Sequence, residues 1–446
     1  MNEQKILGEV FIPWDDYYEM ITPYENSIQI LVGRKGSGKS ALLDFLTIKT
    51  EEQKIPVVRM TPENLKYQPK DITSLALISE EIYDKVIFAI ANEIGKTVSG
   101  YISNDDAVVI DQAIQAGERP ALSIDKIIHS LAPIGKALTK IDFEAMLPKY
   151  AMKTPEMVRA IKNISEKKYT AFYLLIDDTD HISLPQNKNY LEEIWGFIIA
   201  IQKIARMIPN IKPIVSIRSE IWQRLNDDDC GARDQIDHYR LLVKNLHPTD
   251  EKMKEIIEKR LKAACKDLGI SQRNEFAPFF ERVDCKLPSS NERRLWTDYF
   301  ITSSRFRPRD SIQLINELAQ SAIDNQREII IDFDVDNTAY KYSHERVKDI
   351  LNENQYLTDQ LLVIIKSFKN IPFTNEAKTI LRHLDGLPGT AHIEIKRNIM
   401  RVSDEDNIFV IWKLLYDIEF LTPKTKDARF PRGFRFIRPH EDTELV

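Results

Sequence analysis

Four short apolar runs stand out in the first half of the chain, and stretches of helical periodicity separate them. The runs lie at Ser27–Val32, Ile55–Met60, Ala171–Ile176 and Lys212–Ile217. Strands that are buried on both faces of a parallel sheet show such continuous apolar runs. Helices are expected at Ser40–Thr47 and near Tyr190–Met207. Strands that alternate with helices in this way predict an α/β fold with a doubly wound parallel sheet.

A long segment separates the second predicted strand from the third. Connections within a compact domain usually take a few residues, whereas this segment runs to roughly a hundred. It holds an apolar-periodic helix at Leu75–Gly95 and a more polar stretch at Ser103–Ser123. We interpret residues 75–165 as a helical insertion in the first domain. An arm that binds a partner is the alternative.

From Thr249 onward the pattern becomes helical. The predicted helices lie at Glu251–Leu268, Asn274–Val283, Asn291–Thr302 and Arg309–Asp324. Further helical segments follow from Ser343, and they end in a polar hairpin at Glu419–Arg438. These patterns predict three domains, with an α/β core at 1–248, a helical subdomain at 249–335 and a C-terminal domain at 336–446.

The composition of the 446 residues narrows the class of protein. The net charge of −6 excludes a basic surface over the whole molecule, so any contact with nucleic acid needs a local basic patch. No run approaches the roughly eighteen apolar residues of a membrane span, and the first residues lack the features of a leader. The three cysteines, Cys230, Cys265 and Cys285, lack the spacing of metal ligands. We therefore expect a cytoplasmic protein.

Glycine is scarce, at 14 residues, but three glycines fall within one short motif. The motif is GRKGSGKS, from Gly33 to Ser40, and it lies between an apolar strand and the sequence ALLDFL. It fits the P-loop pattern G-x-x-x-x-G-K-[ST], in which backbone N–H groups at a helix N-terminus surround phosphates. Lys39 is expected to reach the β- and γ-phosphates, and Ser40 to ligate Mg²⁺. The expected nucleotide-binding residues are Gly33, Arg34, Lys35, Gly36, Ser37, Gly38, Lys39, Ser40 and Ala41.

A pair of acids follows the third apolar run, in the sequence YLLIDD. We expect Asp177 to hold Mg²⁺, directly or through water, and Asp178 to orient and activate an attacking water. Acids at strand ends also occur as solvated caps, which is the alternative. Asp180 lies beyond the strand, and we expect it to be a helix cap or a surface group.

The fourth run also ends in polar residues, Ser216 and Arg218. Ser216 is placed to contact the γ-phosphate or the attacking water from the adjacent strand. Arg218 is expected to neutralise transition-state charge, or else to form a structural salt bridge with a nearby acid.

Two basic segments lie in the second half of the chain. Arg305, Arg307 and Arg309 precede or open a helix, where they suit phosphate recognition or a salt-bridged helix start. The hairpin at 419–438 carries six cations and a single acid between Thr422 and Arg438, with phenylalanines among them. It is either a DNA contact or an ordinary hairpin with its cations in solvent. The candidate DNA contacts are Lys424, Lys426, Arg429, Arg432 and Arg435.

Four segments, GRKGSGKSALL, YLLIDD, SIRSEIW and RPRDSIQLINE, together resemble the STAND and origin-recognition-like branch of the AAA+ P-loop ATPases. They are most similar to a group of bacterial ATPases often found beside phage-defence or mobile-element genes. The resemblance implies a P-loop NTPase core, a helical lid subdomain and a C-terminal winged-helix-like domain. Arg307 or Arg309 would then be the lid arginine that senses the γ-phosphate.

The resemblance also implies an activity, the hydrolysis of ATP to ADP and phosphate with Mg²⁺. The chain would be a switch or motor subunit of an anti-phage defence system that acts with a protein effector, and a homo-oligomer is a candidate assembly. The alternatives are an origin-recognition-like DNA-binding ATPase for replication, partition or transposition, and a small-molecule kinase. The sequence holds no confident arginine finger and no long C-terminal repeat.

Overall fold

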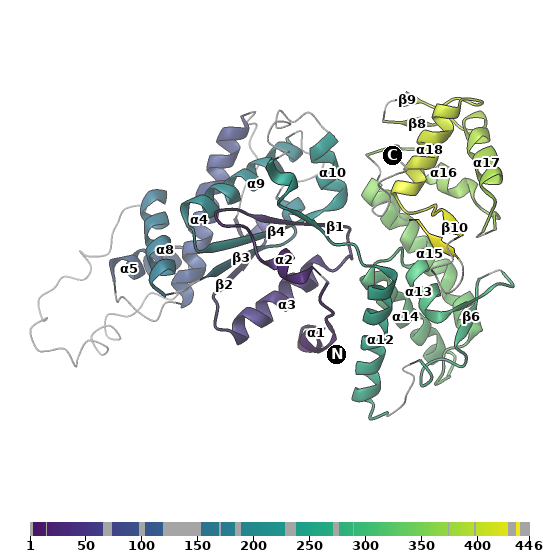
Figure 1. The fold of residues 1–446 in the computed structure, drawn as a ribbon, viewed down its shortest axis with the longest axis horizontal. Coiled ribbons are helices and arrows are strands. Elements are labelled where there is room, and N and C mark those ends of the chain that lie inside the picture. The colour runs from purple at the N-terminus through teal and green to yellow at the C-terminus, as the bar shows by residue number, and fades with distance from the viewer. Residues whose placement is uncertain are drawn as a thin grey trace, which may run out of the picture. The chain divides into compact units, whose positions relative to one another are not determined.

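The chain forms two compact units, Met1–Leu246 and His247–Val446, in a computed structural model. The structure describes residues 3–14, 16–65, 74–97, 103–118, 153–168, 171–182, 189–227, 238–270, 276–288, 290–354, 356–372, 374–396, 398–426 and 434–437. Each unit is described by itself below, and Figure 1 shows the elements of both. None of the described helices is long and apolar enough to cross a membrane.

In the described part of the first unit, five parallel strands form one sheet in the order β2-β3-β4-β1-β5. The strands are β1 (Gln29–Gly33), β2 (Val57–Met60), β3 (Phe172–Ile176), β4 (Ile211–Arg218) and β5 (Val243–Asn245). The α/β class and the four predicted strands are confirmed, each strand with bounds shifted by one or two residues. The fifth strand, β5, was not predicted, because its three residues carry no extended apolar run.

Apolar side chains from the strands enter two separate cores, one on each face of the sheet. Ile30 and Val32 of β1 belong to one core, whereas Leu31 between them belongs to the other. This alternation follows from the two-residue period of a strand. The first core is completed by α4 (Leu75–Thr97), α8 (Thr154–Lys168) and α9 (Tyr190–Met207), the second by α2 (Tyr17–Ile21) and α3 (Lys39–Glu52). The sheet is therefore covered on both faces.

The segment between β2 and β3 contains helices in its described residues, as predicted. Ile82, Val86 and Ile90 of α4 are fully buried in the core against the sheet. The next helix, α5 (Asn104–Gln115), begins with a capping box formed by Ser103 and Asp106 and packs on α4 and α8. The described part of this segment therefore belongs to the packed core. Residues 119–152 lie outside the described residues.

The second unit begins with α12 (Asp250–Asp267), α13 (Trp296–Ser303), α14 (Pro308–Asp324) and α15 (Asp332–Asn354). The helix predicted at Asn274–Val283 is wrong in its described residues, and the helix predicted at Asn291–Thr302 is wrong before Trp296. Residues 276–283 form turns, and β6 (Asp284–Lys286) pairs antiparallel with β7 (Arg293–Leu295), so helix begins only at Trp296. The sequence PSSN at 288–291 favours a turn, and Arg293 forms ion pairs with Asp284 and Asp332 that hold the hairpin in place.

The C-terminal part contains α16 (Leu361–Ser367), α17 (Ala377–Thr390) and α18 (Glu405–Asp417). Two short hairpins accompany them, β8 (Glu394–Ile395) with β9 (Asn398–Ile399), and β10 (Lys424–Lys426) with β11 (Phe434–Phe436). The second pair confirms the hairpin predicted at 419–438. Helix α15 runs without a break through residues 335 and 336, where a domain boundary was expected, and it contributes to the apolar cores on both sides.

Candidate nucleotide-binding site

The glycines of the P-loop motif have definite steric roles. Gly36 and Gly38 have φ angles of 83° and 103°, which favour glycine strongly over residues with a Cβ. A Cβ on Gly33 would lie 2.5 Å from Ser37 Oγ, so this position also requires the smallest residue. These glycines therefore permit the tight turn of the loop, which ends at Gly38, the N-cap of α3 (Lys39–Glu52).

The helix that follows the loop offers its first turn to an anion. Helix α3 begins at Lys39, and no side chain of the described residues caps its N-terminus. The positive end of the helix dipole and the first N–H groups suit a phosphate at this place. Ser40 is exposed in the first turn, and Ser37 Oγ is buried without a hydrogen-bond partner among the described residues. Both hydroxyls can serve a ligand of the loop.

Lys39 places its ammonium group inside the loop. Its Nζ donates hydrogen bonds to the carbonyl oxygens of Gly33, at 2.7 Å, and Arg34, at 3.2 Å, and only 9% of the residue is exposed. Burial lowers the pKa of Lys39, and the acids Glu220, Asp180 and Asp177 act against this effect. A buried cation without a direct carboxylate contact in the described residues has much to gain from an anionic ligand.

Asp177 and Ser216 meet at the carboxyl ends of neighbouring strands. Ser216 Oγ donates to Asp177 Oδ1 at 2.6 Å, and the backbone N–H of Asp178 donates to the same oxygen at 3.0 Å. Both side chains are buried. Strand β4, which carries Ser216, lies between β1 and β3, so the ends of the three strands bring the loop, the serine and the acids to one edge of the sheet.

Asp178 follows β3 in an unusual backbone conformation. Its φ of 50° and ψ of 43° lie in the left-handed region, which aspartate tolerates better than most residues. Burial raises the pKa of Asp178, and the negative charges of Asp177 and Asp180 raise it further, whereas His181 and Arg218 lower it. A carboxylate with a raised pKa accepts a proton more readily than an ordinary aspartate.

Arg59 of β2 is a site residue that the sequence reading missed. Its Nη2 lies 3.3 Å from Asp177 Oδ2, and its Nη1 forms an ion pair with Asp44 of α3. The one available signal was a charged residue within the apolar run IPVVRM. In a sheet covered on both faces, such a residue at a strand end requires a partner.

Arg218 and Asp180 form an ion pair at the same edge of the sheet. Arg218 Nε lies 2.9 Å from Asp180 Oδ2, and Arg218 Nη2 lies 3.3 Å from His181 Nε2. The expectation that Asp180 is a surface group is wrong, because its side chain is buried. Arg218 has the salt bridge that was one of its two expected roles.

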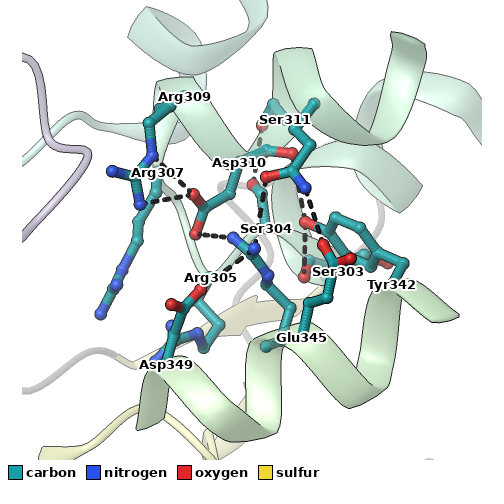
Figure 2. A network of polar contacts seen from close by, with 12 residues as sticks. Ser303, Ser304, Arg305, Arg307, Arg309, Asp310, Ser311, Tyr342, Glu345 and Asp349 are labelled. Carbon is teal, nitrogen blue, oxygen red and sulfur yellow. Dashed lines mark hydrogen bonds and ion pairs between the residues drawn. The ribbon is translucent and has the colours of Figure 1, made fainter. Parts of the chain in front are cut away.

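The basic segment before α14 belongs to the second unit and lies in a buried polar network (Figure 2). Arg307 is 2% exposed, and its two terminal nitrogens each lie 2.8 Å from a carboxylate oxygen of Glu353. Arg309 has a side chain that is 48% exposed and contacts Asp310 at 3.3 Å. Asp310 in turn pairs with Arg346 at 2.8 Å. Arg307 thus has both terminal nitrogens bound to Glu353 of the same unit, whereas the side chain of Arg309 is half exposed to solvent.

The candidate DNA contacts and the three cysteines lie partly within and partly outside the described residues. Lys424 and Lys426 are exposed on β10. Arg429, Arg432 and the side chain of Arg435 lie outside the described residues, as does Cys230. Cys265 and Cys285 are buried and form no disulfide among the described residues, and burial raises the pKa of Cys285 to about 12, which favours its protonated thiol at neutral pH.

A magnesium ion would find a suitable donor set at the loop. Among the described residues, no group of three or more His, Cys, Asp or Glu side chains forms a self-contained metal site. Mg²⁺ binds through one or two protein oxygens together with phosphates and waters. The Ser40 hydroxyl and the Asp177 carboxylate are hard oxygen donors of this kind.

Comparison with known proteins gives a family match for one segment of the chain and a relative that aligns with most of it. Residues 251–351 match the FunZ-associated C-terminal helical domain. Over 399 residues the chain is 23% identical to the putative transposon gamma-delta 80.3 kDa protein of Escherichia coli K12, an alignment that covers 86% of this chain and 55% of that protein. The chain thus spans about half the length of this relative.

Solved structures align with most of the chain, but their TM-scores are low. ORC2 of Aeropyrum pernix, in ADPNP-ADP complexes, has a TM-score of 0.39 and 10% identity, over 97% of this chain and 88% of that one. DnaA of Aquifex aeolicus bound to AMPPCP has a TM-score of 0.34 and 10% identity, over 85% of this chain and 80% of that one. Scores this low establish no shared fold, so the fold class rests on the sheet of the chain itself.

Proposed function

We propose that the chain binds ATP with Mg²⁺ and hydrolyses it to ADP and phosphate. The main support is the convergence at one sheet edge of the loop with Lys39, the carboxylates Asp177 and Asp178, and the Ser216 hydroxyl. The loop offers N–H groups and a buried ammonium to phosphates, and the acids lie on the strand next but one. This arrangement suits phosphoryl transfer to water.

Each residue has a proposed role in that reaction. The loop residues Gly33 to Ala41 bind the phosphates, with Lys39 at the β- and γ-phosphates. Ser40 and Asp177 hold Mg²⁺, which neutralises phosphate charge when it is bound. Asp178 accepts a proton from the attacking water, for which its raised pKa is suited. Ser216 positions Asp177 and Asp178 through its contacts with both.

The arginines are proposed to act differently from one another. Arg309 is the better candidate for the γ-phosphate sensor, because its side chain is half exposed. Arg307 is fully buried and binds Glu353 with both terminal nitrogens, which favours a structural role. Arg218, held by Asp180, is proposed to stabilise charge near the γ-phosphate.

For the biological role, we propose an ATP-dependent switch or motor subunit of a bacterial anti-phage defence system that acts with a protein effector and assembles as a homo-oligomer. The resemblance of the four motif segments to such ATPases supports this role. Binding of ATP would change the population of two states of the chain, and hydrolysis would reset it.

A DNA-binding ATPase of a mobile element is the second candidate. Two observations favour it, namely the similarity to a putative transposon protein and the exposed Lys424 and Lys426 on a hairpin rich in cations. Contacts to phosphates would make the affinity for DNA fall steeply with salt.

One experiment tests the activity and separates these roles. Phosphate release by the purified full chain is measured with ATP and Mg²⁺, with and without duplex DNA, beside Lys39→Ala. Release by the wild type and none by Lys39→Ala supports the ATPase. A several-fold rise with DNA that is lost in a Lys424→Ala and Lys426→Ala double variant supports the second role. A rate without DNA dependence supports a protein-controlled switch, and no release from the wild type contradicts the ATPase.

A further inference from the structure

Arg59 joins the two elements that carry the proposed metal-binding residues. Its guanidinium contacts Asp44 on α3 and Asp177 at the end of β3. Asp44 lies four residues after Ser40, so the two residues occupy the same face of the helix one turn apart. Arg59 therefore connects the helix that carries Ser40 to the strand end that carries Asp177.

The hydrogen bonds of Asp177 leave little room for a direct metal contact. Oδ1 accepts from the Ser216 hydroxyl and from the Asp178 N–H, and Oδ2 accepts from Arg59. A carboxylate has about four lone-pair positions, so three are in use by described residues. The remaining position is on Oδ2, next to the guanidinium. A divalent cation bound there would approach a permanent positive charge.

We infer that Arg59 is a positioning residue that keeps Asp177 out of direct contact with the metal ion, so that Asp177 holds Mg²⁺ through a water molecule. The inference rests on the proposed binding of MgATP. It is compatible with the reluctance of Mg²⁺ to lose its waters. It also gives the exposed Ser40 hydroxyl the direct contact.

The number of waters on the metal tests the inference without turnover. Mn²⁺ replaces Mg²⁺ in a complex of the full chain with ADP, and line broadening by oxygen-17 water in the electron paramagnetic resonance spectrum counts the bound waters. We expect Arg59→Ala to lose one water, because Asp177 then contacts the metal directly. Arg59→Lys, which keeps the charge, and Lys49→Ala, an exposed position further along α3, are expected to keep the wild-type number. An unchanged count in Arg59→Ala overturns the inference.

A metal titration provides the second readout. The Mg²⁺ concentration for half-maximal binding of a fluorescent ATP analogue should fall roughly threefold to tenfold in Arg59→Ala, because a nearby cation is removed. A merely structural role would raise this concentration or leave it unchanged, and either result overturns the inference. If the wild type binds no nucleotide at any Mg²⁺ concentration, the proposed function itself is wrong. If the wild type binds and Arg59→Ala titrates identically, only the role of Arg59 is wrong.

Discussion

Ser216 donates its hydroxyl hydrogen to Asp177 Oδ1 at 2.6 Å and thereby joins the ends of two adjacent strands. We expect Ser216→Ala to lower the rate of ATP hydrolysis at least tenfold, because Asp177 and Asp178 lose a shared contact. The affinity for ATP should stay within about twofold, and the free energy of unfolding should fall by about 1–2 kcal/mol. Turnover, nucleotide titration and urea unfolding measure the three effects.

A matched control for this change is Ser27→Ala, which removes a hydroxyl before the other end of β1. The Ser27 hydroxyl makes a weak hydrogen bond of 3.4 Å to Gln202 Oε1. Turnover close to that of the wild type is expected. Equal losses in both variants would show that Ser216 has no specific role.

Lys39→Met should abolish nucleotide binding without weakening the empty protein. Because burial lowers the pKa of Lys39, its charged form is disfavoured in the folded state, and an uncharged side chain removes that cost. Saturating MgATP at a hundred times its Kd should stabilise the wild type by about 2.7 kcal/mol and Lys39→Met by nothing. Thermal melts with and without MgATP measure this, with Lys49→Met as the control that keeps the wild-type shift. A full shift in Lys39→Met would contradict the proposed site.

Asp178→Asn should bind ATP and hydrolyse it at least about a hundredfold more slowly, since an amide is no proton acceptor. The raised pKa also has consequences for pH. Turnover of the wild type should fall as the pH drops through the raised pKa. The stability that Asp178 contributes is present at low pH and is lost as the pH rises through the folded-state pKa.

The same change should therefore stabilise the fold at neutral pH. We expect Asp178→Asn to melt roughly 2 °C above the wild type at pH 7, with a difference that vanishes at acid pH. Melting temperatures across a pH series provide the measurement. A variant that melts lower than the wild type at pH 7 would refute the buried-charge explanation.

Arg307 and Arg309 should respond to substitution in opposite ways. Arg307→Met leaves Glu353 buried without its bidentate partner and should cost about 3–5 kcal/mol in the free energy of unfolding. Arg309→Ala removes a half-exposed side chain and should cost less than about 0.5 kcal/mol, while slowing ATP turnover. Denaturant unfolding and phosphate release separate the two. A large loss of stability in Arg309→Ala, or unchanged turnover, would count against its role as the sensor.

Much of the first unit could be predicted from the sequence because its signals are local. A strand buried on both faces must be apolar throughout, so β1, β3 and β4 are visible as runs. The P-loop is visible because its glycines satisfy steric needs within a few residues, as the φ angles of Gly36 and Gly38 show. The acids at Asp177 and Asp178 could be placed at a strand end by the run that precedes them.

Other features depended on contacts between residues far apart in the sequence. The place of Arg59 in the site follows from its contacts with Asp44 and Asp177, and Asp177 lies 118 residues away in the sequence. The exposure of Arg309 and the burial of Arg307 follow from the packing of α14 against α15, which the spacing of three arginines does not contain. Strand β7 falls within the helix predicted at Asn291–Thr302, because its charged residues, which pair across the hairpin with β6, also suit a helical pattern.

The uninterrupted helix α15 has a consequence for the mechanics of the second unit. Its 23 residues span about 35 Å, and Glu353 near its end is tied to Arg307 at the beginning of α14. Because Glu353 lies at the end of α15 that leads into residues 361–418, a displacement of those residues reaches the segment of Arg307 and Arg309 through the ion pair of Arg307 with Glu353. Cleavage of the chain at 335–336 would leave this connection in place, whereas loss of the Glu353 carboxylate would remove it.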